Sequence, residues 1–335
     1  MRDSKEKLRN LVAVGDGILP LVSLEDAPVV AHVVRSGYVE SVHRGLAAVT
    51  APDGSLERAV GDPRTPIFPR SSLKPLQAVA SLRAGASLAG EALALACASH
   101  AGEPRHLRGV LEVLAASGLS VADLRNTPGR PGEESALTDW LRAGRGEESL
   151  AQNCSGKHAG MLAACVASGW PTAGYVDADH PLQRLVLATV VELTGEDLVA
   201  VGVDGCGAPV PVFPLVGLAR AFGRLAAAVD GHERRVADAM RDHPAFVGGL
   251  DRPDSDLMAG VPGLIAKLGA EEVFAVGLPD GRGIAVKIAD GGRAARVVTA
   301  ALLRGLVSPD AVARLAESPV LGHGSPVGAV VAVGL

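Results

Sequence analysis

The sequence predicts an α+β fold in which the two ends of the chain form one antiparallel sheet and the middle is mainly helical. Strand-like segments lie in about residues 28–70 and 270–335, whereas helix-like segments fill most of about 71–269. The chain shows no dominant strand–helix alternation and no P-loop or G-x-G-x-x-G motif, which disfavours a doubly wound nucleotide-binding fold. We therefore predict one domain over residues 28–335, with residues 1–27 as a polar leader outside the core.

The N-terminal strands are expected from Val29 onward. The segments VVAHVV and YVESVHRGLAAVTA are rich in strand-forming residues, and the turn PDGS joins the second of them to LERAVG. The later segment SSLKPLQAVASLRAG is predicted to form a helix that Ser71 or Ser72 caps and Gly85 ends. Further helices are predicted at about 88–97, 104–117, 120–125, 156–168, 181–194, 215–229 and 232–242, and from about 293.

The remaining strands are expected in the second half of the chain. The apolar segment LVAVGVD (198–204) is predicted to be a buried strand that runs into the loop GCGAPVP. EVFAVGL and IAVKIADG, joined by the turn PDGRG, form the best hairpin in the sequence, and GAVVAVGL forms a last strand. Residues 126–150 are rich in Gly, Pro and Glu, and we expect them to form a surface excursion.

Composition excludes several classes of protein. The 335 residues are 48% hydrophobic and carry a net charge of −5, and the scattered arginines argue against a nucleic-acid partner. No apolar run reaches the roughly 18 residues that a membrane span needs, and the start lacks a signal-peptide pattern. Four cysteines in a chain of this length do not form a disulfide framework. We expect a cytoplasmic protein with free thiols.

Lysine is rare in this chain. There are 26 arginines and six lysines, and four of the lysines lie in the interior of the sequence. A lysine can lose its proton when it is desolvated, whereas an arginine in practice cannot. The four interior lysines are therefore candidates for chemistry that arginine cannot perform: Lys74, Lys157, Lys267 and Lys287.

The first candidate motif is Ser71-x-x-Lys74. Residues three apart share one face of a helix, and burial near a helix N-terminus favours the neutral amine. Lys74 could then accept the hydroxyl proton and activate the serine as a nucleophile, as in penicillin-binding and β-lactamase sites. The alternative is an N-cap serine beside a surface lysine.

The second candidate is the segment CASHAGEPRH, in which an apolar helix delivers Ser99 and His100 to a glycine-containing loop. These two polar residues suit a site, although they could equally satisfy helix-end carbonyls. Glu103 and His106 have a poor spacing for metal ligands.

The third candidate joins Cys154-x-x-Lys157 to Cys206. The positive end of a helix favours a thiolate and disfavours an ammonium group. Two thiolates and a neutral lysine nitrogen could hold Zn²⁺ and leave a fourth position for water. Asp204 lies two residues before Cys206. Cys97 and Cys165, by contrast, lie on apolar helical faces and are expected in the core.

The fourth candidate is the C-terminal block that contains Lys267 and Lys287. Lys267 is expected to end a short helical piece just before the strand at Val273. Lys287 lies inside an apolar strand, where a lysine is costly unless it faces a site or a partner. An edge-strand lysine that points to water is the alternative for each of them.

Together these motifs resemble one family. The segments RSSLKP, CASHAGE, NCSGKHAGML, DGCGAP, AKLGAEEVFAVG and GIAVKIADG occur in this order, as in the rhizobial-type (class 3) L-asparaginases. The match runs from about Val29 to the C-terminus, and NCSGKHAGML is highly specific. The resemblance implies a serine β-lactamase/glutaminase-like fold, a homodimer, and hydrolysis of L-asparagine to L-aspartate and ammonia.

The resemblance also implies roles for individual residues. It places two Ser–Lys tandems in the site, Ser71 with Lys74 and Ser99 with Lys267, and a zinc ion on Cys154, Lys157 and Cys206 with Asp204 alongside. Arg70 and His158 match further pocket residues. Lys287 occupies the strand where penicillin-binding relatives keep a Lys-Thr-Gly motif, but the sequence here is Lys-Ile-Ala and no catalytic role is carried over.

The predicted mechanism is nucleophilic amide hydrolysis through an acyl-enzyme. We favour Ser71 as the nucleophile because its lysine is closer in sequence, with Ser99 as a proton relay. The alternatives are a penicillin-binding, β-lactamase or glutaminase-type amidohydrolase, and a non-catalytic protein that binds zinc or an amino acid.

Overall fold

The computed structural model describes residues 24–335. Most of the predicted leader, residues 1–27, lies outside this range. Of its last residues, Leu24–Asp26 form a short 3₁₀ helix (η1), and Ala27 is buried against the core.

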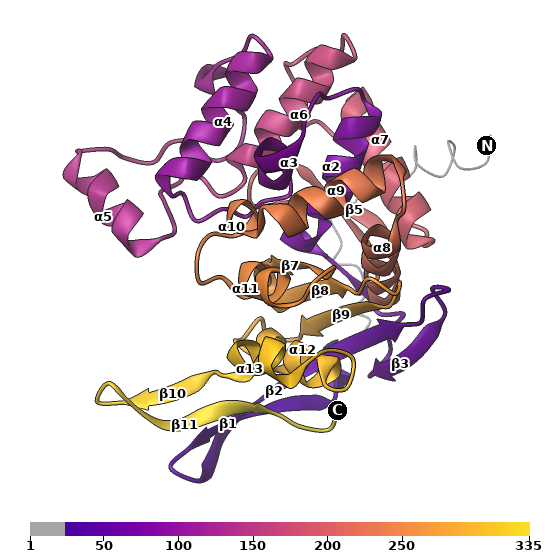
Figure 1. The fold of residues 1–335 in the computed structure, drawn as a ribbon, viewed down its shortest axis with the longest axis vertical. Helices are drawn as coiled ribbons and strands as arrows, with labels where there is room; N and C mark the ends of the chain where they lie inside the picture. Colours follow the sequence, from indigo (N-terminus) through magenta and orange to yellow (C-terminus); the bar gives the residue numbers. More distant parts are fainter. Residues whose placement is uncertain (1–23) are drawn as a thin grey trace.

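Both ends of the described chain meet in one antiparallel sheet, as predicted (Figure 1). The strand order is β10-β11-β1-β2-β9-β8-β7, and β3 pairs with β2. Strand β11 pairs with β1 in an unbroken register from Ala31–Ala332 to Arg35–Gly328, which joins the two chain ends. The strands are β1 (Val29–Arg35), β2 (Tyr38–Thr50), β3 (Leu56–Val60), β7 (Ile265–Gly269), β8 (Val273–Gly277), β9 (Gly283–Ile288), β10 (Pro319–Gly322) and β11 (Ser325–Ala332).

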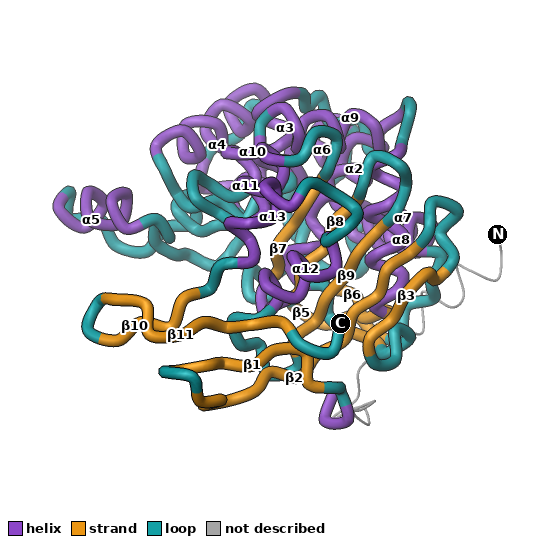
Figure 2. The backbone as a smooth tube through the Cα atoms, turned by 60° about the horizontal axis from the view of Figure 1, so that its bottom comes forward, coloured by secondary structure: helices purple, strands orange, loops and turns teal. Residues whose placement is uncertain are grey.

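The middle of the chain is mainly helical, which confirms the predicted α+β architecture (Figure 2). A second, small sheet in the order β4-β6-β5 lies within it, and β5 is the strand predicted at 198–204. This strand is not buried as predicted: only Ala200 of β5 is buried, and Val203 is exposed, because β5 pairs only with β6 at the edge of the small sheet. Its strands are β4 (Pro66–Ile67), β5 (Ala200–Val203) and β6 (Pro209–Pro214). The α-helices are α2 (Lys74–Arg83), α3 (Gly90–Ala96), α4 (Pro104–Ala116), α5 (Glu134–Arg142), α6 (Ser155–Ala167), α7 (Pro181–Thr194), α8 (Leu215–Ala227), α9 (Gly231–Asp242), α10 (Pro244–Val247), α11 (Pro253–Gly260), α12 (Ala295–Leu303) and α13 (Pro309–Ala316).

Helix α8 packs directly on the backbones of β8 and β9 because two glycines there leave no side chain in its way. A Cβ on Gly283 would lie 1.8 Å from the carbonyl oxygen of Ala219, and one on Gly277 would lie 2.1 Å from that of Phe222. Paired residues of an antiparallel sheet share a face. The register of β7, β8 and β9 therefore places Lys267 and Lys287 on this same face, toward the helical region.

Several local predictions need correction. Lys267 lies in β7 rather than at the end of a helical piece, because its segment pairs with β8. Helix α2 begins after Leu73, and no serine side chain caps it, because a short 3₁₀ helix (η2, Arg70–Leu73) leads directly into it. The predicted helix at 120–125 is only a 3₁₀ turn (η3, Val121–Asp123), and the excursion at 126–150 contains α5. No helix in residues 24–335 is long and apolar enough to cross a membrane.

Candidate active site

The candidate site is built around η2, which lies against the edge strand β7. The buried Ser72 hydroxyl donates to the carbonyl oxygen of Lys267 at 3.0 Å. Gly269 permits the close approach, since a Cβ there would lie 2.8 Å from the carbonyl oxygen of Pro69. Strand β7 therefore borders η2, whereas β9, which carries the Lys-Ile-Ala sequence, lies two strands away.

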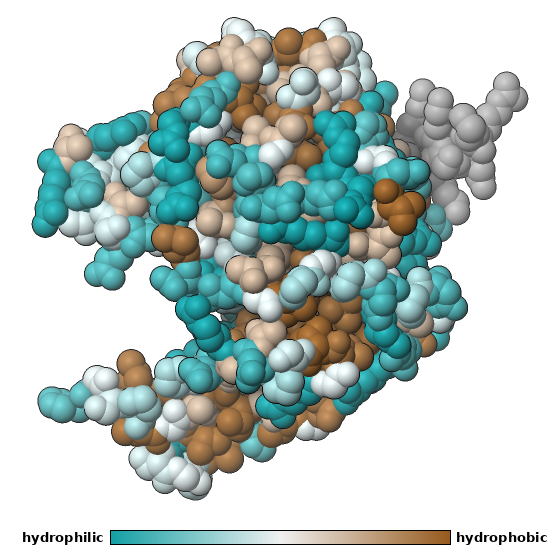
Figure 3. Space-filling model, in the orientation of Figure 1, coloured by the Kyte–Doolittle hydropathy of each residue, from teal (hydrophilic) through white to brown (hydrophobic). Residues whose placement is uncertain are grey.

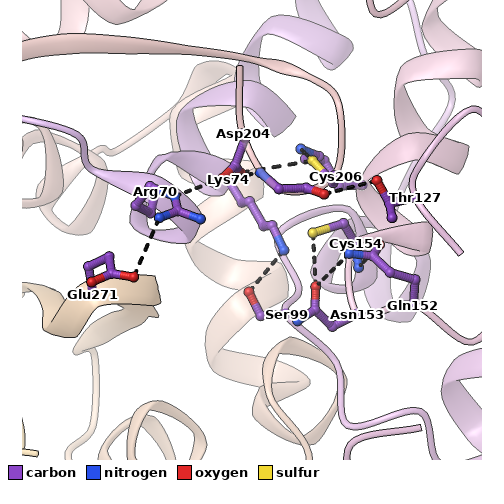
Figure 4. A network of polar contacts seen from close by, with 12 residues as sticks. Arg70, Lys74, Ser99, Thr127, Gln152, Asn153, Cys154, Asp204, Cys206 and Glu271 are labelled. Carbon is purple, nitrogen blue, oxygen red and sulfur yellow. Dashed lines mark hydrogen bonds and ion pairs between the residues drawn. The ribbon is translucent and has the colours of Figure 1, made fainter. Parts of the chain in front are cut away.

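Arg70 opens η2 in a left-handed conformation, with φ at 50°. A non-glycine residue there costs on the order of 1–2 kcal/mol, and such strain is typical of functional sites. Its Nε donates to Oδ1 of Asp204 at 2.8 Å, so η2 is tied to the loop after β5 (Figure 4). Burial alone would raise the pKa of Asp204, but the charges of Lys157 and Arg70 hold it below its usual value.

Lys74 is the centre of the polar network. Its side chain is 1% exposed, and its Nζ donates to the Ala98 carbonyl at 2.6 Å and to Ser99 Oγ at 2.9 Å (Figure 4). Burial lowers the pKa of Lys74. The half-buried Ser71 hydroxyl has no hydrogen-bond partner within residues 24–335. The lysine predicted to pair with Ser71 is therefore in contact with the second serine instead.

Lys267 forms a buried ion pair rather than a contact with Ser99. Its Nζ lies 3.0 Å from Oδ2 of Asp254 and donates to the Leu268 carbonyl at 2.8 Å, and the side chains of the two charged residues are 1% and 3% exposed. Burial alone would raise the pKa of Asp254, but the charge of Lys267 holds it below its usual value. The structure therefore separates the two predicted Ser–Lys tandems into a Lys74–Ser99 contact and a Lys267–Asp254 pair.

The predicted zinc ligands come together from α6 and the loop after β5. Lys157 Nζ lies 3.0 Å from Cys206 Sγ, and Cys154 Sγ lies 2.9 Å from Oδ1 of Asn153. A hydrogen bond with Cys206 lowers the pKa of the Cys154 thiol. Burial alone would lower the pKa of Lys157, but the two neighbouring cysteines raise it.

Two sulfurs and one lysine nitrogen form a donor set that fits Zn²⁺. No group of three His, Cys, Asp or Glu residues within 24–335 could hold a metal, so a metal here would depend on Lys157. The expected loss of the ammonium proton at the helix N-terminus is not found, because the two cysteines raise the pKa of Lys157. Lys157 would have to give up its proton to bind an ion, which an arginine in practice does not do.

His158 is fully buried on the inner face of α6. Its Nδ1 lies 2.7 Å from the hydroxyl of Tyr175, which also accepts the backbone N–H of Arg125 at 3.0 Å. Burial lowers the pKa of His158 well below its usual value and raises that of Tyr175 to about 12. Both side chains are therefore neutral, and His158, which the resemblance placed among the pocket residues, is fully buried against Tyr175.

Sequence reasoning missed several residues of this network. Asn153 directly precedes Cys154 in the most specific motif, so a signal for it was present. Glu271 follows β7 and reaches Arg70, with 4.0 Å between Oε1 and Nη1 (Figure 4). Asp254 gave no signal, because α11 was not predicted and its partner is set only by the fold. Thr127, from the excursion at 126–150, donates to the Gly205 carbonyl at 2.9 Å.

Comparison with known proteins identifies the family. The profile of the L-asparaginase II family matches residues 31–332. The chain belongs to the L-asparaginase II family. Membership implies an L-asparaginase, EC 3.5.1.1. A comparison with curated proteins gives no match.

Solved structures with some likeness include two β-lactamases. One, from Mycobacterium bovis, has a TM-score of 0.36 at 15% identity and covers 84% of this chain and 97% of its own. Another, from Burkholderia vietnamiensis, has a TM-score of 0.32 at 14% identity, with coverages of 82% and 91%. A protein described as Mglu in its glutamate form has a TM-score of 0.36 at 16% identity, with coverages of 90% and 67%. Likeness at these TM-scores supports no statement about activity.

Proposed function

We propose that the protein hydrolyses L-asparagine to L-aspartate and ammonia by serine–lysine catalysis. The observation that carries this proposal is the buried Lys74 amine, 2.9 Å from Ser99 Oγ and three residues along the chain from Ser71. A buried lysine with a lowered pKa can act as a general base near neutral pH. Family membership supplies the substrate class.

Ser71 is the proposed nucleophile, because this residue is half-buried and its hydroxyl has no hydrogen-bond partner in the part of the chain that the structure describes. It attacks the side-chain carboxamide carbon, and Lys74 is the proposed final acceptor of its proton, with Ser99 as the relay that Lys74 contacts; this step requires the Ser71 hydroxyl to turn toward Ser99 when substrate is bound. The same proton route, reversed, protonates the departing ammonia. Water then hydrolyses the aspartyl ester, releasing L-aspartate and restoring the Ser71 hydroxyl.

Lys267 has a different role in this proposal from the pairing with Ser99 that the resemblance implied. Its Nζ lies 3.0 Å from Oδ2 of Asp254, and the pKa of Lys74 is lowered first by burial and further by the nearby charges of Lys157 and Lys267. Lys267 therefore favours a neutral Lys74, which is the form that can accept a proton. This role needs the positive charge of Lys267 but no transfer of its proton.

We also propose that Cys154, Lys157 and Cys206 hold Zn²⁺. When bound, the ion would supply a fixed positive charge near the Arg70–Asp204 pair. The full-length protein, purified without chelators, is expected to contain about one zinc per chain by elemental analysis, a measurement that does not depend on activity.

We further propose that the protein is a homodimer, which light scattering would test. We also propose a cytoplasmic location, which is consistent with its four free cysteines.

The decisive experiment is ammonia release from L-asparagine, with L-glutamine and a penicillin as comparison substrates. We expect release from L-asparagine, lost in Ser71→Ala and strongly reduced in Ser99→Ala. Activity that survives Ser71→Ala but disappears in Ser99→Ala would leave the family activity intact and make Ser99 the nucleophile. No release by the intact protein would overturn the proposed function.

A further inference from the structure

Glu271 presents an available carboxylate at the edge of the candidate site. Its side chain is 63% exposed, and its Oε1 lies 4.0 Å from Nη1 of Arg70. Asp204, on the other side of the same guanidinium, is 12% exposed and already accepts from Arg70 Nε at 2.8 Å and from the backbone N–H of Gly205 at 2.9 Å. Glu271 is therefore the acid beside Arg70 that remains open to a ligand (Figure 4).

The turn that carries Glu271 is strained. Glu271 and Glu272 are consecutive non-glycine residues in the left-handed region, with φ of 57° and 52°. Such conformations persist only where the surrounding structure holds them. Glycine would adopt both conformations without steric strain, so two glutamate side chains at these positions indicate a use for at least one of them.

Three contacts hold this turn in place. The Lys287 ammonium donates to the backbone carbonyl of Glu271, and the Glu272 carboxylate accepts the Ala295 N–H at the start of α12 at 2.8 Å. Gly291 leaves the space that the Glu271 side chain occupies, since a Cβ there would lie 2.7 Å from Glu271 Oε2. The Glu272 carboxylate is directed to α12, whereas the Glu271 carboxylate is directed to Arg70.

Lys287 reaches the turn from within the sheet. It lies in β9 opposite Val273 and is 8% exposed, on the sheet face shared with Lys267. A nearly buried lysine is costly unless it satisfies a partner, and its partner here is the backbone of the strained turn. Its position therefore supports the direction of the Glu271 carboxylate rather than chemistry of its own.

We propose that Glu271 binds the α-ammonium group of the substrate, and that Lys287 is a positioning residue that holds the Glu271 turn. An α-amino acid carries a cation and an anion on one carbon, which matches an Arg–Glu pair that is close but not in tight contact. Arg70 takes the α-carboxylate and Glu271 takes the α-ammonium group. This inference rests on the proposed function of the same site.

The test compares L-asparagine with succinamate, which is asparagine without its α-amino group. We expect Glu271→Gln to lower kcat/KM for L-asparagine by about 10- to 100-fold, the range for loss of a hydrogen bond to a charged group, mainly through KM. The value for succinamate should stay within about twofold, because that substrate does not use the carboxylate. Equal losses on both substrates, or no loss on either, would overturn the assignment.

Glu272→Gln is the matched control, since it makes the same change of charge in the same turn. It should leave the ratio of the two kcat/KM values unchanged. Lys287→Met alone should reduce the preference for L-asparagine over succinamate. Combined with Glu271→Gln, it should cause no further loss, because the two substitutions remove the same interaction with the α-ammonium group. Independent, additive losses would refute the positioning role of Lys287.

Binding separates this inference from the proposed function. Calorimetry of L-aspartate against succinate reports the same discrimination without turnover, in wild type and in Glu271→Gln. If the wild type is inactive but prefers L-aspartate to succinate, and Glu271→Gln loses this preference, the proposed hydrolysis is refuted and the ammonium site is supported. If the wild type is active and Glu271→Gln keeps the preference for L-aspartate, the proposed hydrolysis is supported and the ammonium site is refuted.

Discussion

Removing the carboxylate of Asp254 should destabilise the protein through the charge that it leaves behind. In Asp254→Ala the Lys267 ammonium stays 1% exposed and loses its partner at 3.0 Å. Breaking a buried ion pair from one side costs about 3–5 kcal/mol, because the remaining charge is uncompensated. With 335 residues, the entropy of unfolding is about 0.7 kcal/mol/K, so Tm should fall by about 4–7 °C.

The double variant Asp254→Leu with Lys267→Met isolates the cause. Both charges are then absent, and the unfolding free energy should return to within about 2 kcal/mol of wild type in urea titrations followed by circular dichroism. Ammonia release should stay low, since the charge of Lys267 acts on Lys74. A single variant that costs less than about 1 kcal/mol, or a double variant no more stable than the single one, would refute the reasoning.

The pH dependence of this pair has a fixed sign. Lys267 holds the folded pKa of Asp254 below its ordinary value of 3.8, so the contribution of the pair is fully present above that value. It is lost as the pH falls through the lowered folded pKa. The stability difference between wild type and the double variant should therefore be constant from about pH 7 to 5 and change only below about pH 4.

Three further outcomes are expected. Gly269→Ala places a Cβ 2.8 Å from the Pro69 carbonyl oxygen, so it should displace η2. We expect kcat to fall at least about tenfold while the circular dichroism spectrum stays native, and unchanged kinetics would contradict the importance of this close approach. Cys206→Ser should lower the zinc content measured by elemental analysis, and the core residue variant Cys165→Ser should keep it. Gly223→Ala puts a Cβ 2.2 Å from the carbonyl oxygen of Gly281, in the turn before β9. It should lower the free energy of unfolding by about 1–3 kcal/mol in denaturant titrations, and a variant as stable as the wild type would contradict this.

Local pattern was sufficient for much of this protein. The apolar alternation near both ends predicted a sheet that joins them, and β1 and β11 pair as expected. Helices α6 and α7 begin and end within a residue of their predicted bounds. The Cys-x-x-Lys spacing set Cys154 and Lys157 one turn apart, because residues three apart on a helix are neighbours whatever surrounds them.

The partners of the lysines were decided by tertiary structure alone. Lys74 is three residues from Ser71 but contacts Ser99, 25 residues away, and Lys267 contacts Asp254 rather than a serine. Burial requires each ammonium group to find an acceptor, but which acceptor lies within 3 Å depends on how strands and helices pack. Sequence spacing therefore determined which residues could perform chemistry, and the packing of η2, β7 and α11 determined which of them meet.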